Sequence, residues 1–97
     1  MPAARADLDD AVAYLAVRSP ASAEALLRRA VRAAESLQTL SERGRIVPDM
    51  NAPSVREIIV RPYRLVYRVR PERIEIMGLI HGARDFRAWW QEAGRQR

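Results

Sequence analysis

The chain has 97 residues and a formal net charge of +5, and all seventeen of its basic residues are arginine. Its length is that of one domain with a modest core, and the lack of cysteine excludes disulfides, thiolate metal sites and cysteine nucleophiles. No apolar run approaches the ~18 residues of a membrane-spanning helix, and no secretory signal pattern opens the chain. We therefore expect a soluble cytoplasmic protein, with its basic surface in residues 55–97, which hold ten arginines against five acidic residues.

Two helices are predicted in the first half of the chain. The first spans about residues 4–18, and its apolar side chains recur at helical spacing: Leu8, Ala11, Val12 and Leu15. Ser19 suits the N-cap and Pro20 the first turn of a second helix, whose apolar residues recur every three or four positions over residues 20–43. The two helices are expected to form an antiparallel hairpin.

The second half of the chain predicts an antiparallel sheet. Two prolines in residues 45–54 indicate a loop with at most a short edge strand at 46–47. From Tyr63 onward apolar and arginine side chains alternate strictly, which is typical of a half-buried strand. The expected strands and the tail that follows them span about residues 55–60, 63–70, 73–80 and 83–97.

A two-residue turn after Arg70 fixes the predicted register of the last two strands. It sets Arg68 opposite Glu75 as a cross-strand ion pair, a contact that contributes roughly 0.2 to 1 kcal/mol. The same register sets Val66 opposite Met77 and Leu65 opposite Gly78.

The alternation assigns the strand residues to two faces and predicts a two-layer α+β domain with the helix hairpin packed on the sheet. The face beneath the helices is expected to hold Ile58, Val60, Tyr63, Leu65, Tyr67, Val69, Ile74, Ile76 and Ile80. The opposite face is expected to hold Ile59, Arg64, Val66, Arg68, Arg70, Glu75, Met77, Leu79 and His81. Such a mixed apolar and charged face indicates that a partner or the chain's own tail covers it.

Several segments together resemble the RelE/ParE superfamily of type II toxin–antitoxin toxins, and in particular its ParE branch of plasmid stabilisation proteins. These are the opening P-A-A-R-A-D-L-D-D, the break S-P-A-S-A, the run P-S-V-R-E-I-I-V-R-P-Y-R-L-V-Y-R-V and the closing I-H-G-A-R-D-F. The family fold is a strand, a helix hairpin and an antiparallel sheet. The segment matching the family's first strand is expected to be missing, because this chain begins with the residues that follow it. Residues 73–80 should then have an unpaired edge.

The resemblance implies two different chemistries. ParE-like members poison DNA gyrase by protein contact and are not hydrolases, whereas RelE-like members cut messenger RNA on the ribosome. RNA cleavage needs a proton acceptor, a proton donor and cations for the developing charge. No residue is assigned as catalytic; if the chain is a nuclease, the candidates are Arg64, His81 and Arg84. A toxin-shaped remnant that only binds its antitoxin is a third possibility.

The resemblance also implies a cognate antitoxin, whose acidic, partly disordered C-terminal segment folds onto this chain to form a hetero-oligomer. Contact with partner or target is expected at Arg64, Arg68, Arg70, Met77, Leu79, His81, Arg84, Arg87, Trp89 and Trp90. Two alternatives remain open, since the tryptophans could instead fold back over their own sheet and Arg84 could pair with Asp85. No phosphate loop, metal cluster or nucleotide motif occurs, so no cofactor or metal is expected.

Overall fold

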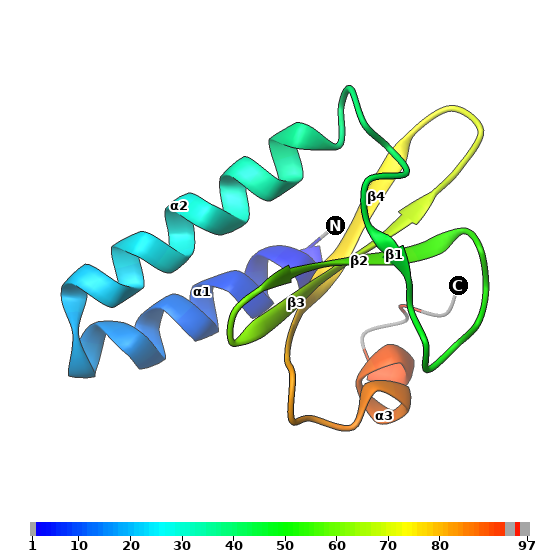
Figure 1. The fold of residues 1–97 in the computed structure, drawn as a ribbon. Helices are drawn as coiled ribbons and strands as arrows, with labels where there is room; N and C mark the ends of the chain where they lie inside the picture. The colour runs from blue at the N-terminus through cyan, green and yellow to red at the C-terminus, as the bar shows by residue number, and fades with distance from the viewer. Residues whose placement is uncertain (1, 93–94, 96–97) are drawn as a thin grey trace.

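The computed structural model describes residues 2–92 and residue 95. In chain order the elements are α1 (Pro2–Arg18), α2 (Pro20–Ser36), β1 (Arg45–Ile46), β2 (Val55–Val60), β3 (Tyr63–Val69), β4 (Ile74–His81) and α3 (Phe86–Gln91). The hairpin of α1 and α2 lies on one side of the sheet and the short α3 on the other (Figure 1). The predicted α+β arrangement is thereby confirmed, with α3 as an addition.

The sheet is antiparallel throughout and has the order β1-β2-β3-β4. β1 pairs with β2 through two residues only, opposite Arg56 and Glu57. β4 pairs only with β3 within the described part of the chain, so the predicted edge strand is present.

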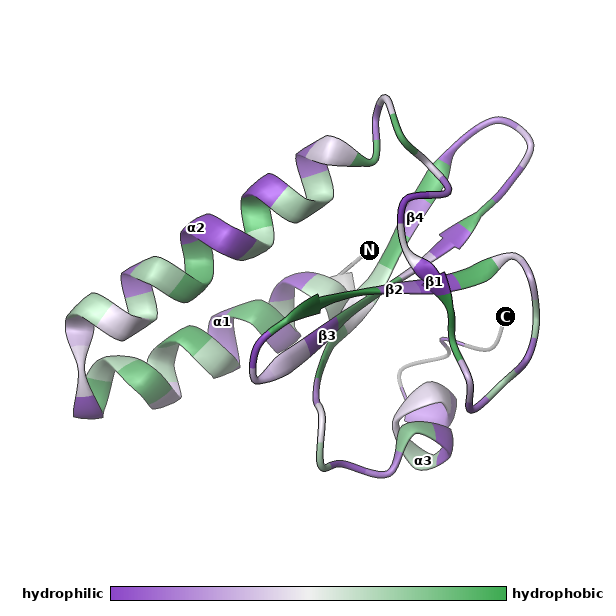
Figure 2. Ribbon diagram, in the orientation of Figure 1, coloured by the Kyte–Doolittle hydropathy of each residue, from purple (hydrophilic) through white to green (hydrophobic). Residues whose placement is uncertain are grey.

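The predicted helix hairpin is present, with the predicted cap at its break, but its second helix is shorter than predicted. The Ser19 hydroxyl accepts a hydrogen bond from the Ser22 amide, which caps α2, and Pro20 begins the helix. α2 then ends at Ser36 instead of residue 43. The side chain of Ser36 donates to the Ala33 carbonyl and accepts from Arg43, so the chain turns back at this point. Along α2, polar and apolar residues alternate in bands, as Figure 2 shows.

The register of β3 and β4 agrees with the prediction only in its first part. Arg68 lies opposite Glu75 as expected, but Val66 pairs with Gly78, and Leu65 with Leu79, because Met77 is an extra residue at a bulge. A bulge of one residue exchanges the faces of all later side chains. Leu79 therefore packs beneath the helices and Ile80 beneath α3, which reverses the predicted assignment of both.

Gly78 belongs to this irregular part of β4 and has no room for a side chain. A Cβ atom there would overlap the carboxylate of Asp7 and lie 2.5 Å from the Trp89 ring. Both α1 and α3 therefore reach the edge of β4 at the residue that follows the bulge.

Two apolar clusters hold the layers together. The cluster beneath the helices consists of Ala11, Leu26, Ala30, Ala33, Leu37, Ile58, Val60, Leu65, Tyr67 and Leu79. The cluster beneath α3 consists of Val47, Val55, Val66, Met77, Ile80, Phe86, Trp89 and Trp90. No helix in the described part of the chain is long and apolar enough to cross a membrane.

Candidate interaction site

The sheet face that the sequence singles out as a contact surface lies beneath the chain's own tail. Asp85 caps α3 by accepting from the Ala88 amide, and the aromatic rings of α3 pack on the sheet, with Trp89 fully buried and Trp90 only 8 % exposed. Of the two alternatives for the tryptophans, the structure has the folded-back tail. Met77 is buried under it, and Leu79 is buried on the helix side.

Arg64 is an interior residue of this face. Its side chain is 12 % exposed and lies 2.5 Å from a carboxylate oxygen of Glu57 and 2.6 Å from one of Asp49. Its guanidinium also lies 4.8 Å from the centre of the Phe86 ring. Burial alone would lower the pKa of Arg64, but the hydrogen bonds to Asp49 and Glu57 raise it. Arg64 is therefore a fixed cation that joins the sheet to the loop before β2.

Glu57 is the centre of this ion network. Its side chain is fully buried and lies 2.5 Å from Arg45 as well as from Arg64. Sequence reasoning did not identify the network, although the hairpin of β2 and β3 places Ile59 opposite Arg64 and so brings Glu57 to a diagonal position. The sequence pattern could not predict that Asp49 joins the network, because Asp49 lies in the irregular loop between β1 and β2.

Three arginines surround Glu75 at the other end of β3. The carboxylate lies 2.6 Å from Arg70 and 3.2 Å from Arg68 and from Arg73. The predicted pair of Arg68 and Glu75 is thus confirmed, and two further arginines join it. The hydrogen bond from Arg70, followed by those from Arg73 and Arg68, lowers the pKa of Glu75 to about 2.

The predicted contact residues His81, at the end of β4, and Arg84 and Arg87, which follow it, are all exposed. The ring of His81 accepts a hydrogen bond from the Ala83 amide at Nδ1 and meets the Tyr63 ring edge-on at 5.4 Å. Arg84 pairs with Glu92 and not with Asp85. The three residues named for a nuclease therefore each have a different partner: Arg64 binds carboxylates of the sheet and loop, His81 binds its own turn, and Arg84 binds the tail.

Asp7 and Arg95 close part of the open edge of β4. The Asp7 carboxylate accepts from the Leu79 amide at 3.1 Å, and Arg95 donates to the Met77 carbonyl at 3.2 Å. Burial raises the pKa of Asp7, opposed by the Leu79 amide and by Arg95. No pattern in the sequence indicated this contact, which joins the two ends of the chain.

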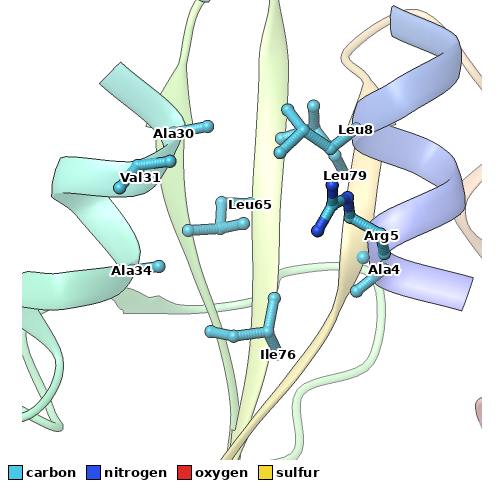
Figure 3. A pocket seen from close by; sticks show the side chains of 10 residues that line it. Ala4, Arg5, Leu8, Ala30, Val31, Ala34, Leu65, Ile76 and Leu79 are labelled. Carbon is cyan, nitrogen blue, oxygen red and sulfur yellow. The ribbon is translucent and has the colours of Figure 1, made fainter. Parts of the chain in front are cut away.

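An apolar pocket of about 240 Å³ lies between the two long helices. In Figure 3, side chains of α1 form one wall, side chains of α2 the other, and Leu65 and Ile76 the floor. The apolar lining consists of Ala4, Leu8, Ala30, Val31, Ala34, Leu65, Ile76 and Leu79. Such a pocket suits an apolar side chain of a protein partner. The described residues contain no group of three or more side chains placed to hold a metal ion.

Comparison with protein families gives a match over most of the chain. Residues 1–86 match the model of the ParE toxin of type II toxin–antitoxin systems, parDE. No curated protein sequence matches the chain. The matched segment includes the helix hairpin, the whole sheet and the start of α3. On this match, the chain belongs to the ParE toxin family of type II toxin–antitoxin systems, whose toxins act with an antitoxin partner.

Proposed function

We propose that this toxin inhibits growth by binding DNA gyrase in the cytoplasm, without hydrolysing a substrate, and that its cognate antitoxin neutralises it. The observation that carries the proposal is the state of the carboxylates on the arginine-rich face. Glu57 is fully buried between two arginines. Glu75 is held by three arginines, with its pKa near 2.

Glu75 is a weak proton acceptor in these surroundings, because accepting a proton would break its ion pairs. His81 is the only histidine in the chain, and its Nδ1 already accepts the Ala83 amide. Cleavage of RNA through the 2′-hydroxyl requires an acceptor next to the cations that stabilise the transition state. Arg64, the most central cation of this face, has Glu57 and Asp49 beside it as bound counter-ions. This arrangement supports a binding protein over a nuclease.

The surface after β4 is the part we assign to gyrase. Arg84 and Arg87 are exposed there, close in sequence to His81 at the end of β4. Trp89 and Trp90 act indirectly in this proposal, because they hold α3 against the sheet and so fix the position of the two arginines. Met77 packs against these tryptophans from the sheet and so also helps to hold α3 in place.

The test is a supercoiling assay with purified gyrase and the purified chain, with and without the antitoxin. We expect loss of supercoiling, recovery when the antitoxin is added, and weaker inhibition by the variant Arg87→Glu at unchanged thermal stability. Full supercoiling at saturating toxin would refute gyrase as the target.

The same protein should then be tested on translated messages by primer extension. Cuts at codon positions would assign the chain to the RelE-like nucleases. Intact messages together with inhibited gyrase would support the proposal. Normal growth during unopposed expression would indicate a chain that binds antitoxin without being toxic.

A further inference from the structure

Another pocket, between α2 and β2, gathers arginine side chains with no acidic side chain among its described lining residues. Its volume is about 240 Å³, and it is lined by Arg29 and Arg32 of α2 and by Arg43 of the loop after α2. The rest of the described lining is apolar and consists of Ala33, Ile58, Ile59 and Val60. Like charges around one small pocket repel each other, so the pocket favours a bound anion.

Arg61, in the turn between β2 and β3, extends this group of cations. Arg29 donates a hydrogen bond to the Arg61 carbonyl at 2.9 Å, which holds the turn beside α2. The side chains of all four arginines are exposed. We call Arg29, Arg32, Arg43 and Arg61 the basic patch.

No cation of the basic patch has a carboxylate partner in the part of the chain that the structure describes. Arg29 and Arg43 donate to neutral oxygen atoms, a backbone carbonyl and a serine hydroxyl. The arginines around Glu57 and Glu75, in contrast, share a carboxylate within the chain. The basic patch therefore presents uncompensated positive charge, which is typical of a surface that binds a polyanion.

The chemistry of the pocket suits the phosphates of a duplex better than an unpaired strand. The planar guanidinium group donates two parallel hydrogen bonds to phosphate oxygens. Proteins that hold single strands stack the bases on aromatic rings, and no aromatic side chain is among the described lining residues of this pocket. The pocket therefore fits a phosphate backbone whose bases are paired with one another.

The basic patch is connected to the surface that we assign to gyrase. The Gly82 amide donates to the Pro62 carbonyl at 2.9 Å, so the turn that carries Arg61 contacts the turn that precedes Arg84. Gyrase works on duplex DNA. A toxin bound to gyrase through Arg84 and Arg87 thus has a polyanion available in the same assembly.

We infer that the basic patch binds the phosphate backbone of duplex DNA, so that the toxin contacts the DNA that gyrase holds as well as gyrase itself. The choice of DNA rests on the gyrase target of the proposed function. Contacts to phosphates carry no sequence information, and each one releases bound counter-ions. Four such contacts predict that the logarithm of the association constant falls with the logarithm of the salt concentration with a slope of about −3.6. Affinity then falls roughly a hundredfold between about 50 and 200 mM salt.

The first experiment measures binding of the purified chain to a short fluorescent DNA duplex by anisotropy over a series of salt concentrations, without gyrase or antitoxin. We expect the slope given above and equal affinity for duplexes of unrelated sequence. Arg32→Gln and Arg61→Gln should each reduce the slope by about 1, because each removes one phosphate contact. Neither side chain belongs to an apolar cluster, so both variants should fold.

Arg18→Gln is the matched control, because it removes the same charge at the far end of the helix hairpin (Figure 1). It should keep the wild-type slope and bind within about twofold of wild type. Equal slopes in all four proteins, or no binding of the duplex at low salt, would overturn the inference.

Other ligands of the patch give distinct results. Tighter binding of a single-stranded oligouridylate than of the duplex would overturn the inference in favour of RNA. Displacement of the duplex by inorganic phosphate at constant ionic strength would overturn it in favour of a site for a small anion.

The second experiment separates this inference from the proposed function. In the supercoiling assay, Arg32→Gln should need at least about threefold more toxin than wild type for half inhibition, and Arg18→Gln should match the wild type. Equal inhibition by Arg32→Gln and wild type would overturn the contact with the DNA that gyrase holds. A wild-type chain that binds the duplex with the expected slope but leaves supercoiling intact would refute gyrase as the target and support the DNA site.

Discussion

The guanidinium of Arg95 lies 2.7 Å from the carboxylate of Asp7, although 88 residues separate the two in the chain. The same guanidinium stacks on the Trp89 ring at 4.0 Å and donates to the Trp89 carbonyl. With its side chain only 3 % exposed, Arg95 fastens the tail to α1 and to the edge of β4. This contact stabilises α3 over the face that the sequence marks as a contact surface.

Removing one partner of this pair should destabilise the fold strongly. Asp7→Ala leaves the buried Arg95 cation and the Leu79 amide without their acceptor, and we expect the free energy of unfolding to fall by about 3 kcal/mol. Urea unfolding followed by circular dichroism measures it. Asp9→Ala is the matched control, since Asp9 forms an exposed pair with Arg5 on the same helix and should cost less than about 1 kcal/mol. Equal losses in the two variants would contradict the role of the Asp7 contact.

Glu75 should make the stability of the protein depend on pH in the acid range. Because its pKa is about 2 in the folded chain, against the ordinary value of 4.5 for a glutamate, the unfolded chain binds the proton more tightly. Its contribution is complete above about pH 4.5 and is lost as the pH falls toward 2. Thermal unfolding of the wild type and Glu75→Gln between pH 7 and pH 2 should therefore converge at the acid end. Glu72→Gln, in the adjacent turn, is the matched control: Glu72 forms no ion pair among the described residues, so at pH 7 this variant should be about as stable as the wild type.

Gly44 should not tolerate a side chain. Its amide donates to the Tyr67 hydroxyl at 2.8 Å, and an added Cβ would lie 2.5 Å from the Glu57 carbonyl oxygen. Gly44→Ala should lower the free energy of unfolding by about 1 to 3 kcal/mol, as overpacking does. At Gly82 the nearest atom is 3.4 Å from the added Cβ, so Gly82→Ala should leave stability nearly unchanged. Chemical denaturation of both variants tests the contrast.

Arg64→Ala should lower the free energy of unfolding. The substitution leaves the buried Glu57 with Arg45 as its one remaining partner and removes the anchor of Asp49, so we expect a loss of about 3 kcal/mol. A loss of growth inhibition in this variant is then a consequence of unfolding. Arg61→Ala, an exposed arginine of the preceding turn, should stay within about 0.5 kcal/mol of wild type. A stable Arg64→Ala protein that fails to inhibit gyrase would instead assign Arg64 to the target contact.

Local patterns predicted the elements of this fold well. Helical spacing and the Ser19-Pro20 break define the helix hairpin, and the tight turn after Arg70 sets Arg68 opposite Glu75. Gly78 inside the strand was a local signal of an irregularity, but the position of the bulge at Met77 also depends on how α1 and α3 meet Gly78. For the same reason the exchanged faces of Leu79 and Ile80 were not predicted.

The candidate site was harder to predict than the fold. Alternation assigned Arg64 to the correct face, but its exposure depends on a loop residue, Asp49, and on a tail that folds back from the far end of the chain. The pocket beside Ile59 gave no signal either, since Arg29 and Arg32 of α2 approach Ile59 only after the hairpin packs on the sheet. Contacts between segments distant in sequence decide which arginines are neutralised and which remain available.

The placement of the two tryptophans makes intrinsic fluorescence a probe of the C-terminal tail. Both belong to α3, Trp89 is buried beneath a guanidinium, and no other tryptophan exists in the chain. Intrinsic fluorescence therefore reports chiefly the packing of the tail on the sheet and on Asp7 of α1. A partner that lifts α3 would shift the emission to longer wavelength as the buried indoles meet water.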